Sequence, residues 1–385
     1  MENMDLLSQL VAALGWNASD ASIKLSVVVW SGFILAFVFG YVANKTQFCT
    51  MGAVSDVVNM NDWGRMRAWL LAIAVAILGT SAMIYLGKLD PAKTIYTSST
   101  FFWLAALVGG FTFGVGMTLA GGCGQRTLVR IGGGNLKSVV VFLFLGYAAL
   151  VTLRGLFGVF RQNVLQAPSV THQFDGMQTL PALMGYADKS GTLMFGLAIG
   201  LVLLAFVFAS KEFRANFDNI LAGIVVGLIV IGGWYVTGRF GFGENPETLE
   251  SVYLGATNPA FAESMTFVAP LAYTMNLFSF WSDTSTIVTF GIASVFGVIA
   301  GSLVYSLVHR TFRWESFTSP QDMLRHIVGA TLMGFGGVTA IGCTIGQGVT
   351  GVSTLSLASF LVLASIIAGA AMTMKIQYAM MMRAT

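Results

Sequence analysis

The chain has 385 residues, of which 56% are hydrophobic and only 10% are charged. Soluble domains carry roughly 25% charged residues, so a soluble fold of this size could not cover its surface with so few charges. The net charge of +3 includes no basic patch that could bind nucleic acid, and three cysteines are too few for a disulfide scaffold.

The first segment, residues 1–23, is acidic: it carries Glu2, Asp5 and Asp20 and no Lys or Arg. A secretory signal peptide needs a basic region ahead of its apolar stretch. We therefore interpret residues 1–23 as an N-terminal extension and not as a cleaved signal.

The following residues form a series of apolar segments, each about as long as a helix that crosses ~30 Å of hydrocarbon. These segments are residues 24–43, 65–86, 100–121, 136–154, 191–210, 217–237, 284–309, 322–342 and 354–379. The sequence thus predicts an all-α polytopic membrane protein in contact with membrane lipid, with about nine transmembrane helices. We assign a first repeat to residues 24–210, a second to 217–379 and a C-terminal tail to 380–385.

Four semi-apolar stretches between these segments are too short to cross a bilayer. They are residues 47–59, 122–131, 261–278 and 343–351. Their length favours short re-entrant helices. Backbone of that kind is tolerated at membrane depth only where it is buried in protein or lines a cavity.

The positive charges predict the orientation of the chain. Seven Lys and Arg residues fall on the side of the N-terminus and thirteen on the other side, which accounts for all 20. Cytoplasmic loops carry the excess of positive charge. We therefore expect the N-terminus outside the cell and the C-terminus in the cytoplasm.

An internal repeat links two of the long segments at a constant offset of 220 residues. Identical residues stand at both positions for Gly109, Gly114, Gly116, Ala120, Gly122 and Cys123. The same offset superimposes the second apolar segment on the seventh and the fourth on the ninth. Because the matched segments are an odd number of crossings apart, the sequence predicts two inverted repeats, an architecture typical of transporters.

The repeat also predicts a binding site. Cys123 and Cys343 each follow a long segment, directly after Gly122 and Gly342, and open a short one. The N-terminus of a helix presents free N–H groups and a partial positive charge, which favours an anion. Cys49 opens a third short segment, whose counterpart near residues 268 and 269 has no cysteine.

Polar residues beside these cysteines allow two interpretations. Four of them could donate hydrogen bonds to an anion, or they could satisfy the broken backbone: Thr50, Gln125, Thr344 and Gln347. Arg126 could attract an anion, or it could be a positive charge at the cytoplasmic end of a helix. We expect Asp56 to be a solvated charge at a helix end. The cysteine spacings are not those of zinc or haem sites, so we expect no metal, no cofactor and no catalytic residue.

The cysteine motifs resemble the YeeE/YedE family of sulfur-compound transporters, nearest to its YedE-type branch. The matching stretches are residues 121–135 (GGCGQRTLVRIGGGN), residues 334–348 (GFGGVTAIGCTIGQG) and Phe48-Cys49. The resemblance implies a multi-pass protein of the prokaryotic inner membrane, with two inverted halves. It implies that thiosulfate passes a constriction by S–H hydrogen bonds to Cys49, Cys123 and Cys343. It also implies a small cytoplasmic TusA-like sulfur carrier as a partner.

Three functions remain as hypotheses from the sequence. We favour uptake of a small sulfur-containing anion, most readily thiosulfate. The first alternative is a membrane thiol enzyme or sulfur relay that uses the cysteines covalently, although no close cysteine pair is encoded. The second alternative, suggested by the YedE-type branch, is transport of a selenium compound.

Overall fold

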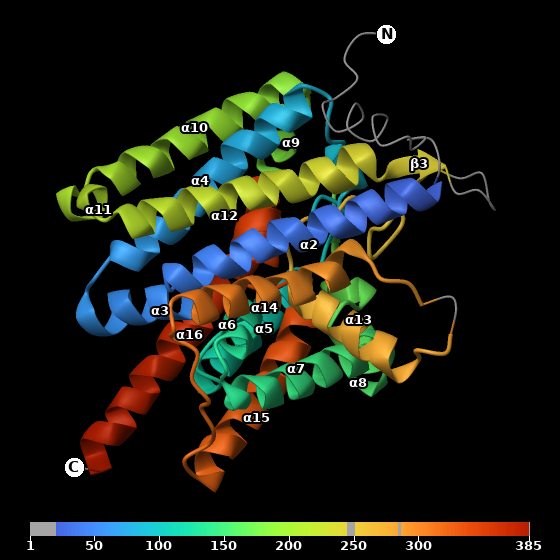
Figure 1. The fold of residues 1–385 in the computed structure, drawn as a ribbon. Helices are drawn as coiled ribbons and strands as arrows, with labels where there is room; N and C mark the ends of the chain where they lie inside the picture. Colours follow the sequence, from blue (N-terminus) through green and yellow to red (C-terminus); the bar gives the residue numbers. More distant parts are fainter. Residues whose placement is uncertain (1–20, 245–250, 284–285, 385) are drawn as a thin grey trace.

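The computed structural model describes residues 21–244, 251–283 and 286–384. Of the predicted N-terminal extension, residues 1–20 lie outside this range. Nine long helices dominate the described chain (Figure 1). They are α2 (Ala21–Lys45), α4 (Gly64–Tyr85), α5 (Trp103–Leu119), α7 (Leu136–Arg154), α10 (Lys189–Phe208), α12 (Phe217–Tyr235), α14 (Phe290–Val308), α15 (Pro320–Thr339) and α16 (Leu357–Ala384).

The long helices confirm the prediction of an all-α polytopic membrane protein. Among the described residues, 8 helices are long and apolar enough to cross a membrane. The helix that falls short is α15, because Asp322, Arg325 and His326 in its first two turns lower its hydropathy. Helix α15 nevertheless packs between α5 and α7, which both meet the criterion. The residues assigned to a C-terminal tail form, up to Ala384, the last turns of α16.

Short helices occupy all four of the predicted short segments. They are α3 (Thr50–Ser55) with the π-helix η1 (Asp56–Met60), α6 (Gly124–Gly132), α13 (Val268–Ser279) and the π-helix η6 (Gly346–Gly351). Two further π-helices, η3 (Arg161–Leu165) and η5 (Val236–Phe240), lie in or beside the connections. The only strands in the described residues are two antiparallel pairs, β1 (Thr100–Phe101) with β2 (His172–Gln173) and β3 (Phe242–Glu244) with β4 (Ser251–Tyr253).

The crossing of α5 and α15 depends on glycine. A Cβ atom on Gly109 would lie 2.8 Å from the carbonyl oxygen of Gly336, and one on Gly116 would lie 2.6 Å from that of Gly329. The two helices therefore run antiparallel with their backbones in contact. Because the offset of 220 converts Gly109 into Gly329 and Gly116 into Gly336, it exchanges the two contacts. A two-fold relation between antiparallel helices produces this pattern.

Neighbouring helices follow the same exchange. Helix α16 packs on α5, and α7 packs on α15. Gly114 contacts the backbone of Ile366 and Ala370 in α16, while Gly334 contacts Leu145 and Ala149 in α7. On the other side of the molecule, α2 packs between α12 and α14, and α4 packs between α10 and α12 (Figure 1). At the offset of 220, α5 corresponds to α15 and α7 to α16, so the contact of α5 with α16 and the contact of α15 with α7 correspond.

The connection between α7 and α10 folds back onto the second half of the chain. It contains α8 (Leu156–Phe160), η3, the 3-10 helix η4 (Pro168–Val170), β2 and α9 (Leu180–Leu183). The amide of Leu180 donates to the carbonyl of Leu355 over 2.9 Å, and the amide of Leu357 donates to that of Gln178 over 2.9 Å. These bonds fix the connection beside the residues that follow η6.

Candidate functional site

The same kind of turn precedes each cysteine. The residue two positions before the cysteine has a left-handed backbone: φ is 53° at Gln47, 69° at Gly121 and 57° at Ile341. The next amide donates to the carbonyl five residues earlier, from Phe48 to Ala43 over 3.1 Å, from Gly122 to Met117 over 2.9 Å and from Gly342 to Gly337 over 2.7 Å. This is a Schellman-type helix ending. Helices α2, α5 and α15 thus end in one way, and each ending places a cysteine next.

The three cysteines are free thiols in the protein interior, with exposed fractions of 8% at Cys49 and 0% at Cys123 and Cys343. Cys49 and Cys343 accept backbone N–H groups at 3.4 Å, from Gly52 and Gly346 respectively. The thiol of Cys123 instead donates to the side-chain oxygen of Gln125 over 3.6 Å. Cys49 and Cys123 cap α3 and α6 as predicted, whereas Cys343 precedes η6 by a further turn.

The structure brings the cysteines of both halves together. Cys123 lies within electrostatic range of both Cys49 and Cys343, and beside the hydroxyl of Thr344. Beyond this group, Cys49 interacts with the guanidinium groups of Arg65 and Arg126, and Cys343 with the ring of Tyr96. The thiols therefore form a series with arginines at one end.

Two threonine hydroxyls of this series have no hydrogen-bond partner. Thr50 follows Cys49 and is 1% exposed, and Thr344 follows Cys343 and is 0% exposed. Neither side-chain oxygen makes a well-aligned hydrogen bond to a described residue, although the hydroxyl of Thr344 lies close to the thiol of Cys123. A buried, unsatisfied hydroxyl costs about 1–3 kcal/mol. Both groups are therefore available to a ligand that enters the series.

The two glutamines satisfy the broken backbone. The amide of Gln347 donates to the carbonyl of Ala340 over 2.7 Å, and its oxygen accepts from Ser359 over 2.6 Å. The amide of Gln125 donates to the carbonyl of Phe48 over 3.3 Å, which links α6 to the turn before Cys49. Of the two interpretations of these side chains, the structure thus favours the supporting one.

Gly122 and Gly342 allow side chains to fold over the turns. A Cβ atom on Gly122 would lie 3.0 Å from Cγ of Arg126, and one on Gly342 would lie 2.9 Å from Cγ of Gln347. Arg126 reaches past Gly122 and donates to the side-chain oxygen of Gln47. Both glycines therefore leave room for the side chains of Arg126 and Gln347, and they can bind a ligand only through their backbone.

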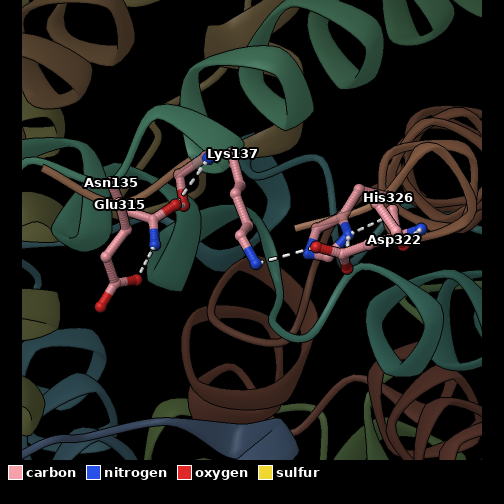
Figure 2. Close-up of polar contacts among 7 residues, drawn as sticks. Asn135, Lys137, Glu315, Asp322 and His326 are labelled. Atoms are coloured by element: carbon pink, nitrogen blue, oxygen red, sulfur yellow. Dashed lines mark hydrogen bonds and ion pairs between the residues drawn. The ribbon is translucent and has the colours of Figure 1, made fainter. Parts of the chain in front are cut away.

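Arg126 also lines a cavity of about 410 Å³, which we call the Arg126 cavity. Three further cationic side chains line it: Arg130, Lys137 and Arg313. Its wall is held by polar bonds between the start of α7 and the start of α15 (Figure 2). Lys137 donates to Asp322 over 2.8 Å, Asp322 pairs with His326 at 3.2 Å, and Asn135 donates to Glu315.

Asp56 is not the solvated charge that we expected from the sequence. It is 3% exposed and forms a two-pronged ion pair with Arg65, from Nε and Nη2 of the guanidinium. Arg65 also covers the helix α3, where a Cβ atom on Gly52 would meet its Nη1. The two residues are nine apart in sequence, and the turn after η1 brings their side chains together.

A second cavity, of about 230 Å³, lies beside Gly342 at the opposite end of α7, and we call it the Gly342 cavity. Its lining includes Tyr96, Arg161, Glu263 and Ile341. No sequence motif marks Tyr96, Arg161 or Glu263, because these residues come from separate connections. Among the described residues, no group of three His, Cys, Asp or Glu side chains is arranged to hold a metal ion.

Comparison with known proteins identifies the family. Residues 45–372 match the family described as sulphur transport. The thiosulfate transporter TsuA of Escherichia coli is 26% identical over 348 residues, which cover 83% of this chain and 86% of that protein. The thiosulfate transporter TsuA of Spirochaeta thermophila is 26% identical over 343 residues, or 87% and 94% of the two chains. The chain therefore belongs to the sulphur transport family.

Proposed function

We propose that the protein takes up a small sulfur-containing anion, most readily thiosulfate, across the prokaryotic inner membrane. The two halves are inverted repeats, with the N-terminus outside and the C-terminus in the cytoplasm. The anion passes between them along the series of thiols at Cys343, Cys123 and Cys49. The names of the two relatives and the family support the substrate class.

The observation that carries the proposal is the buried series of thiols and free hydroxyls. Three free cysteines from both halves come together with the unpartnered hydroxyls of Thr50 and Thr344. A buried anion needs fixed donors in place of its water shell. Thiols and hydroxyls supply donors without a permanent charge, so that the anion is bound at each step and can still leave.

The arginines give the pathway its direction in this proposal. Arg65 and Arg126 interact with Cys49, and the Arg126 cavity adds further positive charge. If this end faces the cytoplasm, the anion moves toward increasing positive potential. A small TusA-like carrier would collect sulfur from the same end.

Uptake of labelled thiosulfate tests the proposal. We expect alanine at Cys123 or Cys343 to abolish uptake while the purified variants remain folded, because losing a buried S–H removes a donor but little packing. Serine keeps a hydroxyl of similar reach and should retain part of the activity. Ser294→Ala is the matched control, since this buried hydroxyl bonds only to the carbonyl of Phe290 in its own helix.

Competition separates this function from its alternatives. Thiosulfate should compete best, followed by sulfate and then by a neutral thiol such as cysteine. A sulfur relay that uses the cysteines covalently would lose all activity with serine, and a selenium transporter would prefer a selenium oxyanion. Normal uptake by all three single alanine variants would refute a role for the thiols.

A further inference from the structure

The Gly342 cavity brings together groups that the proposed pathway does not use. It lies against the turn that ends α15, and Tyr96 in its wall interacts electrostatically with Cys343. Its other polar walls come from two different connections: Arg161 from η3, and Thr257 and Glu263 from the segment before α13. The cavity therefore lies beside the turn that carries the first thiol of the series.

Arg161 is an uncompensated cation in this wall. Its Nη1 donates to the side chain of Gln166 over 2.9 Å, but its buried Nε has no hydrogen-bond partner among the described residues. Among the described residues, Arg161 makes no ion pair, although the carboxylate of Glu263 lines the same cavity. Burial lowers the pKa of Arg161, and no carboxylate offsets this effect. An unpaired guanidinium edge that faces a cavity fits an oxyanion.

Glu263 is the one carboxylate among these lining residues. It accepts hydrogen bonds from the backbone N–H and the hydroxyl of Thr257, at 2.9 and 3.0 Å. Of the titratable or charged groups in the surrounding elements, Tyr96 and Tyr273 lie within electrostatic range of Glu263, and Arg154 lies over the ring of Tyr273. Arg161 lines the same cavity, and the backbone N–H of Gly291 also donates to the carboxylate. Burial raises the pKa of Glu263 to about 7 despite these hydrogen bonds. Burial also raises the pKa of Tyr96, so this ring stays neutral.

We propose that the Gly342 cavity is a second binding site for a small oxyanion, where Arg161 binds the anion ahead of Cys343 and Glu263 must be protonated for binding. This inference rests on the proposed function for its substrate, thiosulfate. Arg161 offers two adjacent N–H donors to the oxygens. Glu263 controls the charge of the site, because an ionised carboxylate in the same cavity repels a dianion.

The direction of the pH effect follows from this role. At low pH Glu263 is neutral, and the site carries the net positive charge of Arg161. As the pH rises through about 7, Glu263 loses its proton and the affinity for the anion falls. If binding requires the protonated form, affinity weakens about tenfold one pH unit above that pKa. Thiosulfate itself remains a dianion throughout.

Uptake kinetics of labelled thiosulfate test this site in the full-length protein. Arg161→Gln should raise KM by about tenfold or more, the usual effect of losing a charge-assisted hydrogen bond, with little change in the maximal rate. Arg161→Lys should restore part of the loss, since it keeps the charge but not the fork. Arg239→Gln is the control: it removes an exposed cation from η5, which does not line the cavity.

The pH arm uses Glu263→Gln. Between about pH 6 and about pH 8 the KM of the wild type should rise about tenfold, while this variant should show a flat profile at the low-pH affinity. An unchanged KM in Arg161→Gln, or a wild-type pH profile in Glu263→Gln, would overturn the proposal.

Calorimetric binding of thiosulfate to the purified Cys343→Ala variant separates the two proposals. Transport fails in this variant, but the cavity and Arg161 remain, so binding should persist and should be lost in the double variant with Arg161→Gln. If the wild type took up no thiosulfate but showed this Arg161-dependent binding, the uptake function would fail and the oxyanion site would stand. If thiosulfate binding did not depend on Arg161, the oxyanion site would fail.

Discussion

The segments after Cys123 and Cys343 start from the same turn and then differ. After Cys123 comes α6, a helix of 9 residues that carries Arg126 and Arg130. After Cys343 comes η6, a π-helix of 6 residues that is buried throughout and carries no charge. The residue next to the cysteine is Gly124 in the first case and Thr344 in the second.

Different residues determine the position of the thiols and the polarity of their surroundings. The helix endings place the cysteines, and they are shared between the halves. The residues that follow provide the difference: cations near Cys123, and a neutral hydroxyl near Cys343. Cys49 and Thr50 add a third thiol and hydroxyl to the first half only. Two segments that start from the same turn thus have unlike surroundings.

The largest effect is expected at the crossing of α5 and α15, the two helices that the repeat relates. A Cβ atom would lie 2.6 Å from a backbone oxygen at Gly116 and 2.5 Å from a backbone nitrogen at Gly336. We expect Gly116→Ala and Gly336→Ala each to lower the free energy of unfolding by about 3 kcal/mol, because the backbones must separate. Thermal unfolding in detergent measures both variants.

The matched control for the crossing is Gly176→Ala, where an added Cβ atom has nothing within 4 Å. This variant should unfold like the wild type. The two crossing variants should lose similar amounts of stability, since the offset of 220 converts one position into the other. A large loss in only one of them would break the two-fold relation between the halves.

The next test concerns the hydroxyls that differ between the segments. Thr344→Val removes an unpartnered buried hydroxyl, so the free energy of unfolding should rise by about 1 kcal/mol while the affinity for thiosulfate falls about tenfold. Thr50→Val should behave in the same way. Thr350→Val is the control, because its hydroxyl donates to the carbonyl of Met265 over 2.7 Å and its loss should cost stability. Unchanged affinity in both test variants would remove the hydroxyls from the site.

Hydropathy and glycine spacing predicted much of this fold from the sequence. The long apolar segments agree closely with the long helices, and all four short segments are short helices. The repeat at Gly109 and Gly116 predicted which helices are equivalent, because close backbone contact requires glycine at both. Such signals are local or periodic, and a single sequence can display them.

The parts that sequence analysis missed depend on contacts between distant connections. Arg161 and Glu263 lie about a hundred residues apart in the chain, and they share a cavity only because both connections fold against the end of α15. The burial of Asp56 depends on Arg65 reaching back over α3. The roles of Gln125 and Gln347 stayed open because the same amide can serve a ligand or the backbone.

A smaller effect should mark the charged end of the series. Arg126→Gln removes a partly buried cation that interacts with Cys49 and Cys123. We expect uptake to fall by at most about fivefold, in keeping with the modest energy of incompletely buried charges, and the difference to shrink in high salt. Arg130→Gln is the comparison, since Arg130 lines the same cavity and is not among the groups that act on Cys123. Equal losses in both variants would indicate general attraction by the cavity and no specific role for Arg126.

The smallest expected effect tests the shared turn at its most unusual residue. The left-handed position holds Gly121 in the first half and Ile341 in the second, with φ of 69° and 57°. A residue with a Cβ atom in this conformation is strained by about 1–2 kcal/mol. Glycine avoids this strain, but it loses about 0.5–1 kcal/mol more backbone entropy on folding. Ile341→Gly should therefore raise the free energy of unfolding by less than about 1 kcal/mol, and Gly121→Ala should lower it by about 1 kcal/mol.

Space around Gly121 makes the second variant a clean measure of backbone strain, because an added Cβ atom would meet only Nη1 of Arg130, at 3.5 Å. Ile341 is 36% exposed, so the loss of its partly buried side chain works against the relief of strain in the glycine variant. Chemical unfolding measures the change in the free energy of unfolding for both variants. If Ile341→Gly were clearly destabilising, the isoleucine side chain would be holding the turn by packing. The two halves would then reach the same backbone by different means: conformational freedom at Gly121, and side-chain contacts at Ile341.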